Sequence, residues 1–353
     1  MELLTTSRMK AARLCQRYHH LRYELGYRPV ETDDVLRFGT LVHAGLEAWF
    51  LAKMNGGTDP LGAALAALQG EADPYDRVRA EALLTGYHYR WQEEAYKVVG
   101  VEVQFEAKLI NPGTGAASRT WTLGGKIDAI VEDLRDGRIL LVEHKTSAED
   151  ITPGSSYWRR LRMDGQVSTY FAGARQALGL DVAGCLYDVV AKPGIRPSAV
   201  PLLDEEGVKI VLNAQGERVR TKDGKKWRQT GDTAEGFVLQ SRPETPEEFR
   251  ARLVEAIAAD PDRYYSRGEV VRLDSEMDEA AFDAWQLAQQ IRESQLAQRN
   301  PRNPDACIRF GKPCAFFEVC SGAASLEDPA LFTRSAHVHP ELAGAEAQAE
   351  VAR

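Results

Sequence analysis

Apolar and polar positions along the middle of the chain follow the pattern that β-strands require. Two short apolar runs, 125–132 and 138–144, are rich in Ile, Val and Leu and flank Arg135-Asp136-Gly137. Because Asp-Gly readily supplies the positive φ of a tight turn, these segments together predict a β-hairpin. Further alternating or apolar runs predict strands at 101–110, 120–124, 184–192 and 264–273.

Apolar residues at helical spacing predict helices before and after these strands. The segment 245–260 begins Thr-Pro-Glu-Glu, which is typical of a capped helix start. Asp33 or Asp34 can cap the helix predicted at 35–55. The helices predicted in this way are 7–27, 35–55, 74–97, 245–260 and 276–299.

One stretch between these elements has a different composition. Residues 201–236 contain two turn signals, Gln215-Gly216 and Asp223-Gly224, between short alternating runs, which predicts a protruding β-hairpin insertion. Its cations form either a solvated face or a set of contacts to backbone phosphates. The residues concerned are Arg218, Arg220, Lys222, Lys225, Lys226 and Arg228, with Trp227 among them.

Composition and charge narrow the classes of protein. The chain has 353 residues, 44% of them hydrophobic, and a formal net charge of −8. The charge excludes a surface coated in basic groups, although a local basic channel beside an acidic site is compatible with it. No apolar run reaches the length of a membrane span and the first residues lack a continuous apolar stretch. We therefore expect a cytoplasmic protein without a membrane segment or signal peptide.

The predicted hairpin carries the candidate chemistry. Asp128 interrupts the apolar run of its first strand, and its second strand leads directly into Glu143-His144-Lys145. Since side chains alternate along a strand, Glu143 and Lys145 face one way and His144 faces the other. Two carboxylates and an ammonium suit metal-assisted phosphodiester hydrolysis, in which oxygen ligands hold Mg²⁺ or Mn²⁺. The alternative is a buried salt bridge between Glu143 and Lys145.

Four of the five cysteines form a second candidate site. Cys307, Cys314 and Cys320 cluster in a loop with Gly and Pro, and Cys15 stands near the start of the chain. Cys185 lies in an apolar strand and is interpreted as a buried small hydrophobe. Four thiols suit either tetrahedral Zn²⁺ or an iron–sulfur cluster, and the spacing does not decide between them. A chance cluster is the third interpretation.

The sequences GGKIDAIVED and ILLVEHKTS resemble the PD-(D/E)xK nucleases, and specifically their RecB-like branch. The resemblance implies a restriction-endonuclease-like fold, that is, an α/β domain with a mixed central sheet flanked by helices. It also implies metal binding by Asp128, Glu143 and the backbone carbonyl of His144. In this family the lysine of E-x-K, here Lys145, acts on the water.

Two more motifs of that branch occur in the expected order. GTLVHAGLE matches G-x-x-x-H-x-x-L-E, so the resemblance makes His43 a metal ligand, although a lone helical histidine is more often structural. Gln166 and Tyr170 match Q-x-x-x-Y, which in the family lines the site and contacts substrate. The split of one early cysteine and three late ones is similar to the iron–sulfur members of the branch. On that resemblance we expect a structural [4Fe–4S] cluster on Cys15, Cys307, Cys314 and Cys320.

A segment after the E-x-K motif combines aromatic and cationic side chains. Such a mixture can hold a single strand of nucleic acid, and it is equally compatible with a charged helix start whose aromatics are packed. The predicted DNA-binding residues are Tyr157, Trp158, Arg159, Arg160 and Arg162.

The sequence therefore predicts one iron–sulfur RecB-like nuclease domain over residues 1–325. Its expected parts are a helical region at about 33–98, a nuclease core at about 99–200, the insertion at about 201–236, a helix and cysteine loop at about 244–325, and a loosely ordered tail at 326–353.

The expected function is a metal-dependent exonuclease acting on single-stranded DNA or DNA ends, in recombination, repair, phage DNA metabolism or CRISPR spacer processing. Because no Walker A motif is present, any helicase activity would come from a partner protein. The alternatives are a non-catalytic DNA-binding or scaffold subunit and a zinc-stapled structural protein.

Overall fold

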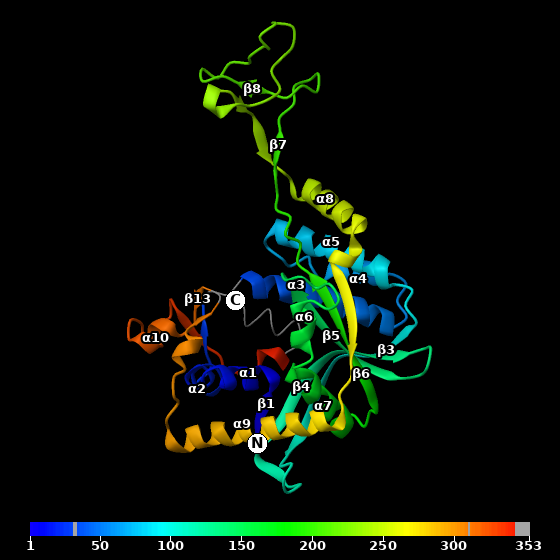
Figure 1. Cartoon of the computed structure of the whole chain (residues 1–353), viewed down its shortest axis with the longest axis vertical. Helices are drawn as coiled ribbons and strands as arrows, with labels where there is room; N and C mark the ends of the chain where they lie inside the picture. The colour runs from blue at the N-terminus through cyan, green and yellow to red at the C-terminus, as the bar shows by residue number, and fades with distance from the viewer. Residues whose placement is uncertain (31–33, 310, 343–353) are drawn as a thin grey trace.

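A mixed β-sheet is the centre of the fold (Figure 1). The computed structural model describes residues 1–30, 34–309 and 311–342. The sheet has six strands in the order β1-β4-β5-β6-β11, and β3 also pairs with β4. The β1–β4 and β5–β6 pairs are parallel and the others are antiparallel. The strands are β1 (Glu2–Thr5), β3 (Tyr96–Ile110), β4 (Ala117–Asp133), β5 (Ile139–Ser147), β6 (Val182–Ala191) and β11 (Tyr265–Val270).

The predicted hairpin is formed by β4 and β5. Gly137 has φ +77° in the turn, and its N–H donates to the Asp133 carbonyl at 2.7 Å. The sequence predicted two strands at 120–124 and 125–132, but these residues form the single strand β4. A Cβ atom on Gly125 would lie 2.6 Å from Cζ of Phe105, so this glycine lets the Phe105 ring pack directly on the strand.

Helices cover both faces of the sheet, which confirms the predicted α/β class with a mixed central sheet. Leu141 of β5 packs in one core with residues of α1, α7 and α9, whereas its neighbours Leu140 and Val142 pack in the other core with residues of α3, α5 and α8. This split follows from the alternation of side chains along a strand. The helices are α1 (Thr6–Leu14), α3 (Asp34–Met54), α4 (Pro60–Ala66), α5 (Pro74–Trp91), α6 (Ser156–Leu161), α7 (Gly165–Ala177), α8 (Pro246–Ala259) and α9 (Asp274–Ala297).

The helix predicted at 7–27 is interrupted at Cys15. That residue has an extended backbone, and it is followed by α2 (Gln16–His19) and a π-helical turn, η1 (His20–Glu24). The segment before the cysteine loop explains the break, because it forms hydrogen bonds with backbone groups of the N-terminal helices on both sides of Cys15. Asn303 Nδ2 donates to the Leu14 carbonyl at 2.9 Å, and the Arg17 N–H donates to the Pro301 carbonyl at 3.1 Å.

The segment after residue 326 is more ordered than the sequence suggested. β14 (Phe332–Arg334) pairs with β2 (Tyr27–Pro29), and Arg28 Nη2 donates to the Val338 carbonyl at 3.0 Å. No local pattern indicates this order, because the partner strand lies about 300 residues earlier. Residues 343–353, and the predicted helix cap at Asp33 or Asp34, lie outside the side chains that the structure describes.

The insertion forms an arm, which we define as residues 199–243 and which projects from the body (Figure 1). Instead of one hairpin it contains two short ladders joined by turns, in which β7 pairs with β10 and β8 with β9. At its root, Glu244 accepts from Arg252 at 2.9 and 2.6 Å and from the Ser198 N–H at 2.9 Å. The arm strands are β7 (Ala199–Pro201), β8 (Val211–Leu212), β9 (Val238–Leu239) and β10 (Ser241–Pro243).

Short elements complete the chain. The cysteine loop lies beside α1 and α2 (Figure 1) and contains β12, β13 and α10. Within the described ranges, the helices are too short or too polar to cross a membrane. The remaining short elements are η2 (Thr233–Glu235), η3 (Pro261–Arg263), η4 (Pro304–Ala306), β12 (Ile308–Arg309), β13 (Lys312–Pro313), α10 (Phe317–Ser321) and η5 (Pro340–Leu342).

Candidate active site

The β4–β5 hairpin brings the two predicted acids and the lysine together. Asp128 lies on β4, and its Oδ2 accepts the backbone N–H of His144 at 2.8 Å. On β5, the Lys145 ammonium donates to Glu143 Oε1. The three residues therefore meet as the alternation along the strands predicted.

Helix α7 supplies the predicted Gln166 and Tyr170 to the same cluster. The Gln166 amide nitrogen donates to Glu143 Oε1 at 2.7 Å and contacts the Tyr170 hydroxyl at 2.8 Å. Its amide oxygen accepts from Lys145 Nζ at 3.1 Å. Asp164 caps this helix by accepting the Gln166 N–H, so the cap holds the backbone of Gln166 in the first turn of α7. Gln166 thus touches both members of the E-x-K motif.

Burial dominates the electrostatics of the two acids. Glu143 is 2% exposed, and burial raises its pKa to about 7 although Lys145 opposes the change. Burial also raises the pKa of Asp128, against the influence of His144. Burial on its own would lower the pKa of Lys145, but the attraction of Glu143 raises it above its ordinary value. One ammonium therefore does not offset the cost of burying two carboxylates, and a further positive charge at this site would stabilise their ionised forms.

The donor set fits a divalent metal ion of the kind that the family implies. Oε2 of Glu143 is buried and makes no hydrogen bond within the described part of the chain. An unused carboxylate oxygen next to a second carboxylate is the type of ligand that Mg²⁺ and Mn²⁺ prefer. Among residues 1–30, 34–309 and 311–342, however, no three His, Cys, Asp or Glu side chains converge closely enough to hold an ion as they stand.

His43 lies near this pair on α3. Its ring is edge-on to that of His144, with the centroids 6.1 Å apart. Burial lowers the pKa of His43 to about 3, and Glu143 acts in the opposite direction. The ring is consequently neutral at physiological pH, which is the form that binds metal.

Two residues that the sequence did not assign also face Asp128. Glu102 on β3 has φ +52°, a left-handed conformation that is unusual for a residue with a side chain, and it forms an ion pair with Lys126. Burial raises its pKa, and its charge raises that of Asp128. Glu47 on α3 is influenced by both Lys126 and Asp128. Glu47 stood in the histidine motif, whereas no sequence signal pointed to Glu102.

A row of charged residues crosses three neighbouring strands of the sheet, β5, β6 and β11. His144 on β5 is paired in register with Asp188 on β6, which is paired with Arg267 on β11. His144 Nδ1 is 3.1 Å from Asp188 Oδ2, at an angle outside hydrogen-bond geometry, and Arg267 donates to Asp188 at 2.8 and 3.2 Å. The Tyr87 hydroxyl also donates to Asp188. Burial opposes ionisation of Asp188, but Arg267 and His144 hold its pKa well below the usual range.

The residues predicted to bind DNA on α6 are divided between the core and the surface. Tyr157 is 8% exposed, and the Trp158 indole N–H donates to the Ile151 carbonyl at 2.7 Å. Tyr157 therefore packs inward, whereas Trp158 is half-buried and packs against the same core. Arg159 and Arg162 are exposed, while Arg160 pairs with Glu149 at 2.8 Å. The exposed part of this segment is therefore mainly cationic, and its role in DNA binding stays a prediction.

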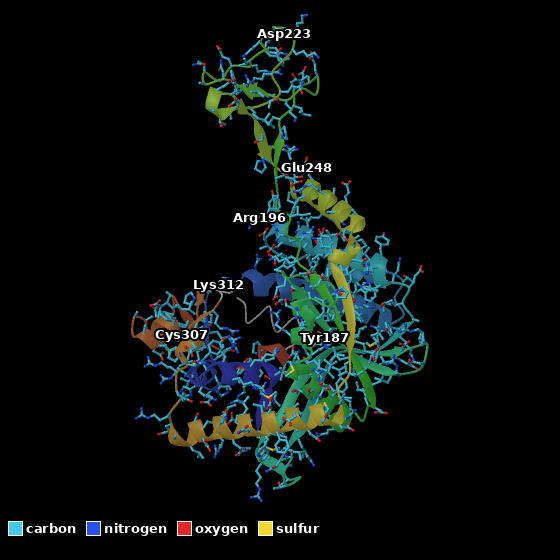
Figure 2. All side chains as sticks on the ribbon, viewed as in Figure 1. Tyr187, Arg196, Asp223, Glu248, Cys307 and Lys312 are labelled. Carbon is cyan, nitrogen blue, oxygen red and sulfur yellow. The ribbon has the colours of Figure 1, made fainter. Side chains whose placement is uncertain are left out.

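The four predicted cluster cysteines line one pocket between the N-terminal helices and the cysteine loop. All four thiols are free, and Figure 2 labels Cys307 among them. Burial raises the pKa values of Cys314 and Cys320. The Cys15 sulfur accepts the Asn303 N–H at 3.4 Å. Cys185 is buried in β6, as predicted for a small hydrophobe.

Comparison with known proteins bears on this site as a whole. The family model of the PD-(D/E)XK nuclease superfamily matches residues 3–321, which include the hairpin, α7 and all five cysteines. A comparison with curated proteins gave no match. The mixed sheet with helices on both faces is consistent with the restriction-endonuclease-like fold that the sequence predicted. Since the match covers nearly the whole chain, the protein belongs to the PD-(D/E)XK nuclease superfamily.

Proposed function

We propose that this protein is a metal-dependent DNA exonuclease of the RecB-like type, which cleaves phosphodiester bonds in single-stranded DNA or at DNA ends. The observation that carries the proposal is the contact set around Glu143, in which one carboxylate oxygen is bound by Lys145 and Gln166 and the other has no partner within the described residues. A carboxylate held in this way is oriented by the protein and still has an oxygen free for a cation.

Each residue of the site has a defined part in this proposal. Asp128, Glu143, His43 and the His144 carbonyl would hold Mg²⁺ or Mn²⁺, which supplies Lewis-acid stabilisation of the phosphorane-like transition state and activation of water. Lys145, which stays protonated beside Glu143, orients the attacking water and offsets negative charge that develops on the phosphate.

Gln166 keeps the working residues in place, because its amide contacts Glu143, Lys145 and Tyr170 at once. Tyr170 closes the far side of this network and is 6% exposed. The protein also supplies a dry environment for the catalytic carboxylate, because Glu143 is 2% exposed. Burial of this kind strengthens electrostatic effects at the reacting bond.

The proposal includes a [4Fe–4S] cluster on Cys15, Cys307, Cys314 and Cys320. Its support is that the four thiols, from segments about 290 residues apart in the chain, line a single pocket. A cluster there would tie the N-terminal helices to the cysteine loop, which is a structural role. Purified protein should then be brown and contain iron, and Cys314→Ala should lower both the iron content and the melting temperature. A colourless protein that contains zinc would replace the cluster by a Zn²⁺ site.

Digestion of end-labelled DNA tests the enzymatic part. We expect wild-type protein to degrade linear DNA with Mg²⁺ or Mn²⁺, to spare circular DNA, and to be inactive in EDTA. Glu143→Gln should reduce the rate by about 100-fold or more, because it removes a charge needed in the transition state. The matched control is Glu149→Gln, an exposed residue of the following loop, which should retain activity. Binding of DNA without cleavage under every condition would instead support a scaffold subunit in a complex whose helicase is another chain.

A further inference from the structure

The far end of the arm is strongly basic in an acidic protein. We define the arm tip as residues 218–228, and Figure 2 labels Asp223 at this end of the molecule. The tip contains six Lys or Arg residues and one acidic residue, a net charge of +5, whereas the whole chain carries −8. The positive charge is therefore concentrated at the point that projects farthest from the body (Figure 1).

The arginines of the tip are used to build the arm. Arg218 and Arg220 lie over the ring of Trp227, at 4.4 and 4.3 Å from the centroid. Arg218 also pairs with Asp204 at 2.8 Å, and Arg228 pairs with Glu235 at 3.3 Å. These contacts give a segment with few buried residues a defined shape.

The lysines of the tip have no such structural use. Lys222, Lys225 and Lys226 are exposed, and within the described residues no carboxylate lies within 4 Å of their ammonium groups. The nearby acid, Asp223, is occupied in the turn itself, because it accepts from the Thr221 hydroxyl at 2.5 Å and from the Lys225 N–H at 3.2 Å. The turn thus holds three cations close together in water, with no acidic partner in the part of the chain that the structure describes.

We infer that the arm tip binds the sugar–phosphate backbone of a nucleic acid, through Lys222, Lys225 and Lys226. Exposed ammonium groups recognise phosphates as point charges, without reading base sequence. A polynucleotide is the polyanion favoured here because the chain belongs to a nuclease superfamily, and because a tip of net charge +5 attracts phosphates even though the chain as a whole is negative. The arm would then grip the substrate at a distance from the catalytic hairpin.

The test is the salt dependence of DNA binding by full-length protein in EDTA, so that cleavage plays no part. Fluorescence anisotropy with a labelled duplex and a labelled single strand gives the slope of log K against log salt concentration. The combined variant Lys222→Gln, Lys225→Gln, Lys226→Gln should bind more weakly, and its slope should be smaller by about 2 to 3, because each lost phosphate contact contributes about 0.7 to 0.9.

A matched variant with the same change of charge separates a local contact from a general effect. Lys108→Gln, Arg119→Gln, Arg292→Gln alters exposed cations of β3, β4 and α9, which belong to the nuclease body (Figure 1), and it should keep the wild-type slope. Equal slopes for the tip variant and wild type, or an equal loss in the control, would overturn the inference. So would tighter binding of wild type to polyglutamate than to DNA, because that result would make the tip a site for acidic protein. Because binding is measured without metal, the salt dependence can be interpreted even if the protein proves to have no nuclease activity.

Discussion

Replacing Glu143 by Gln should stabilise the metal-free protein at neutral pH although it slows cleavage. Burial raises the pKa of this carboxyl from 4.5 to about 7, so the folded protein holds a proton that the unfolded chain releases. The stability linked to that proton is fully present below pH 4.5, is lost progressively as the pH rises, and is gone above about pH 7. The wild-type protein is therefore weakened across this window by a group that it needs for function.

The size of the effect follows from the same two pKa values. Since one pKa unit corresponds to about 1.4 kcal/mol, the full cost above pH 7 is about 3 kcal/mol. Part of the gain will be lost in the variant, because Lys145 then keeps its charge without a carboxylate, although its side chain is 25% exposed and Gln166 still accepts from it. We expect Glu143→Gln to gain about 1 to 3 kcal/mol at pH 7.5, and close to nothing at pH 4.5.

Urea unfolding followed by circular dichroism, in EDTA at pH 4.5 and 7.5, measures this difference. Glu149→Gln serves as the control, because its exposed carboxyl has no burial to relieve. Adding Mn²⁺ at 100 times its dissociation constant should then stabilise wild type by about 2.7 kcal/mol, and the same Mn²⁺ concentration should stabilise the Glu143→Gln variant far less. If the stability of Glu143→Gln follows the wild-type pH curve at a constant offset, the reasoning from burial is wrong.

Three further substitutions test the framework around the site. Asp188→Asn breaks a buried ion pair with Arg267, which keeps its ion pair with Glu94, so the free energy of unfolding should fall by about 1 to 3 kcal/mol; a variant that melts like wild type would contradict this. Gly125→Ala places a methyl group against the Phe105 ring and should cost about 1 to 3 kcal/mol in a denaturant titration, unless the ring can move at no cost. Thr245→Ala removes a capping box and should lower the stability by about 1 kcal/mol, whereas Thr245→Ser should restore most of it.

Local patterns and the family resemblance together predicted several of the residues that meet at the candidate site. Strand alternation placed Glu143 and Lys145 on one side, and helical spacing placed Gln166 and Tyr170 together; the structure joins both pairs in one hydrogen-bond network. The two pairings follow from periods of two and of about 3.6 residues, whereas the resemblance to the RecB-like nucleases implied that the two pairs share one site. The catalytic and metal-binding roles of the residues stay predictions.

Features that depend on residues far apart in the chain could not be predicted from the sequence. The row from His144 through Asp188 to Arg267 needs the order of β5, β6 and β11, which no local pattern gives. Glu102 was not predicted because its place beside Asp128 depends on the register of β3 with β4, in which Val101 pairs with Ala129 and Val103 with Ile127. The aromatics of α6 show the same limit, since composition alone did not reveal that Tyr157 turns inward.

The pairing of β2 with β14 has a consequence for how the protein is made. A ribosome releases the segment around Tyr27 about 300 residues before its partner around Glu327. The hydroxyl of Thr5, at the end of β1, likewise donates to the carboxylate of Glu341 at 2.6 Å, so this contact also depends on a residue synthesised much later. These contacts of the N-terminal segment can form only after the residues around Glu327 and Glu341 have been synthesised, so they close later than contacts that depend on nearer partners.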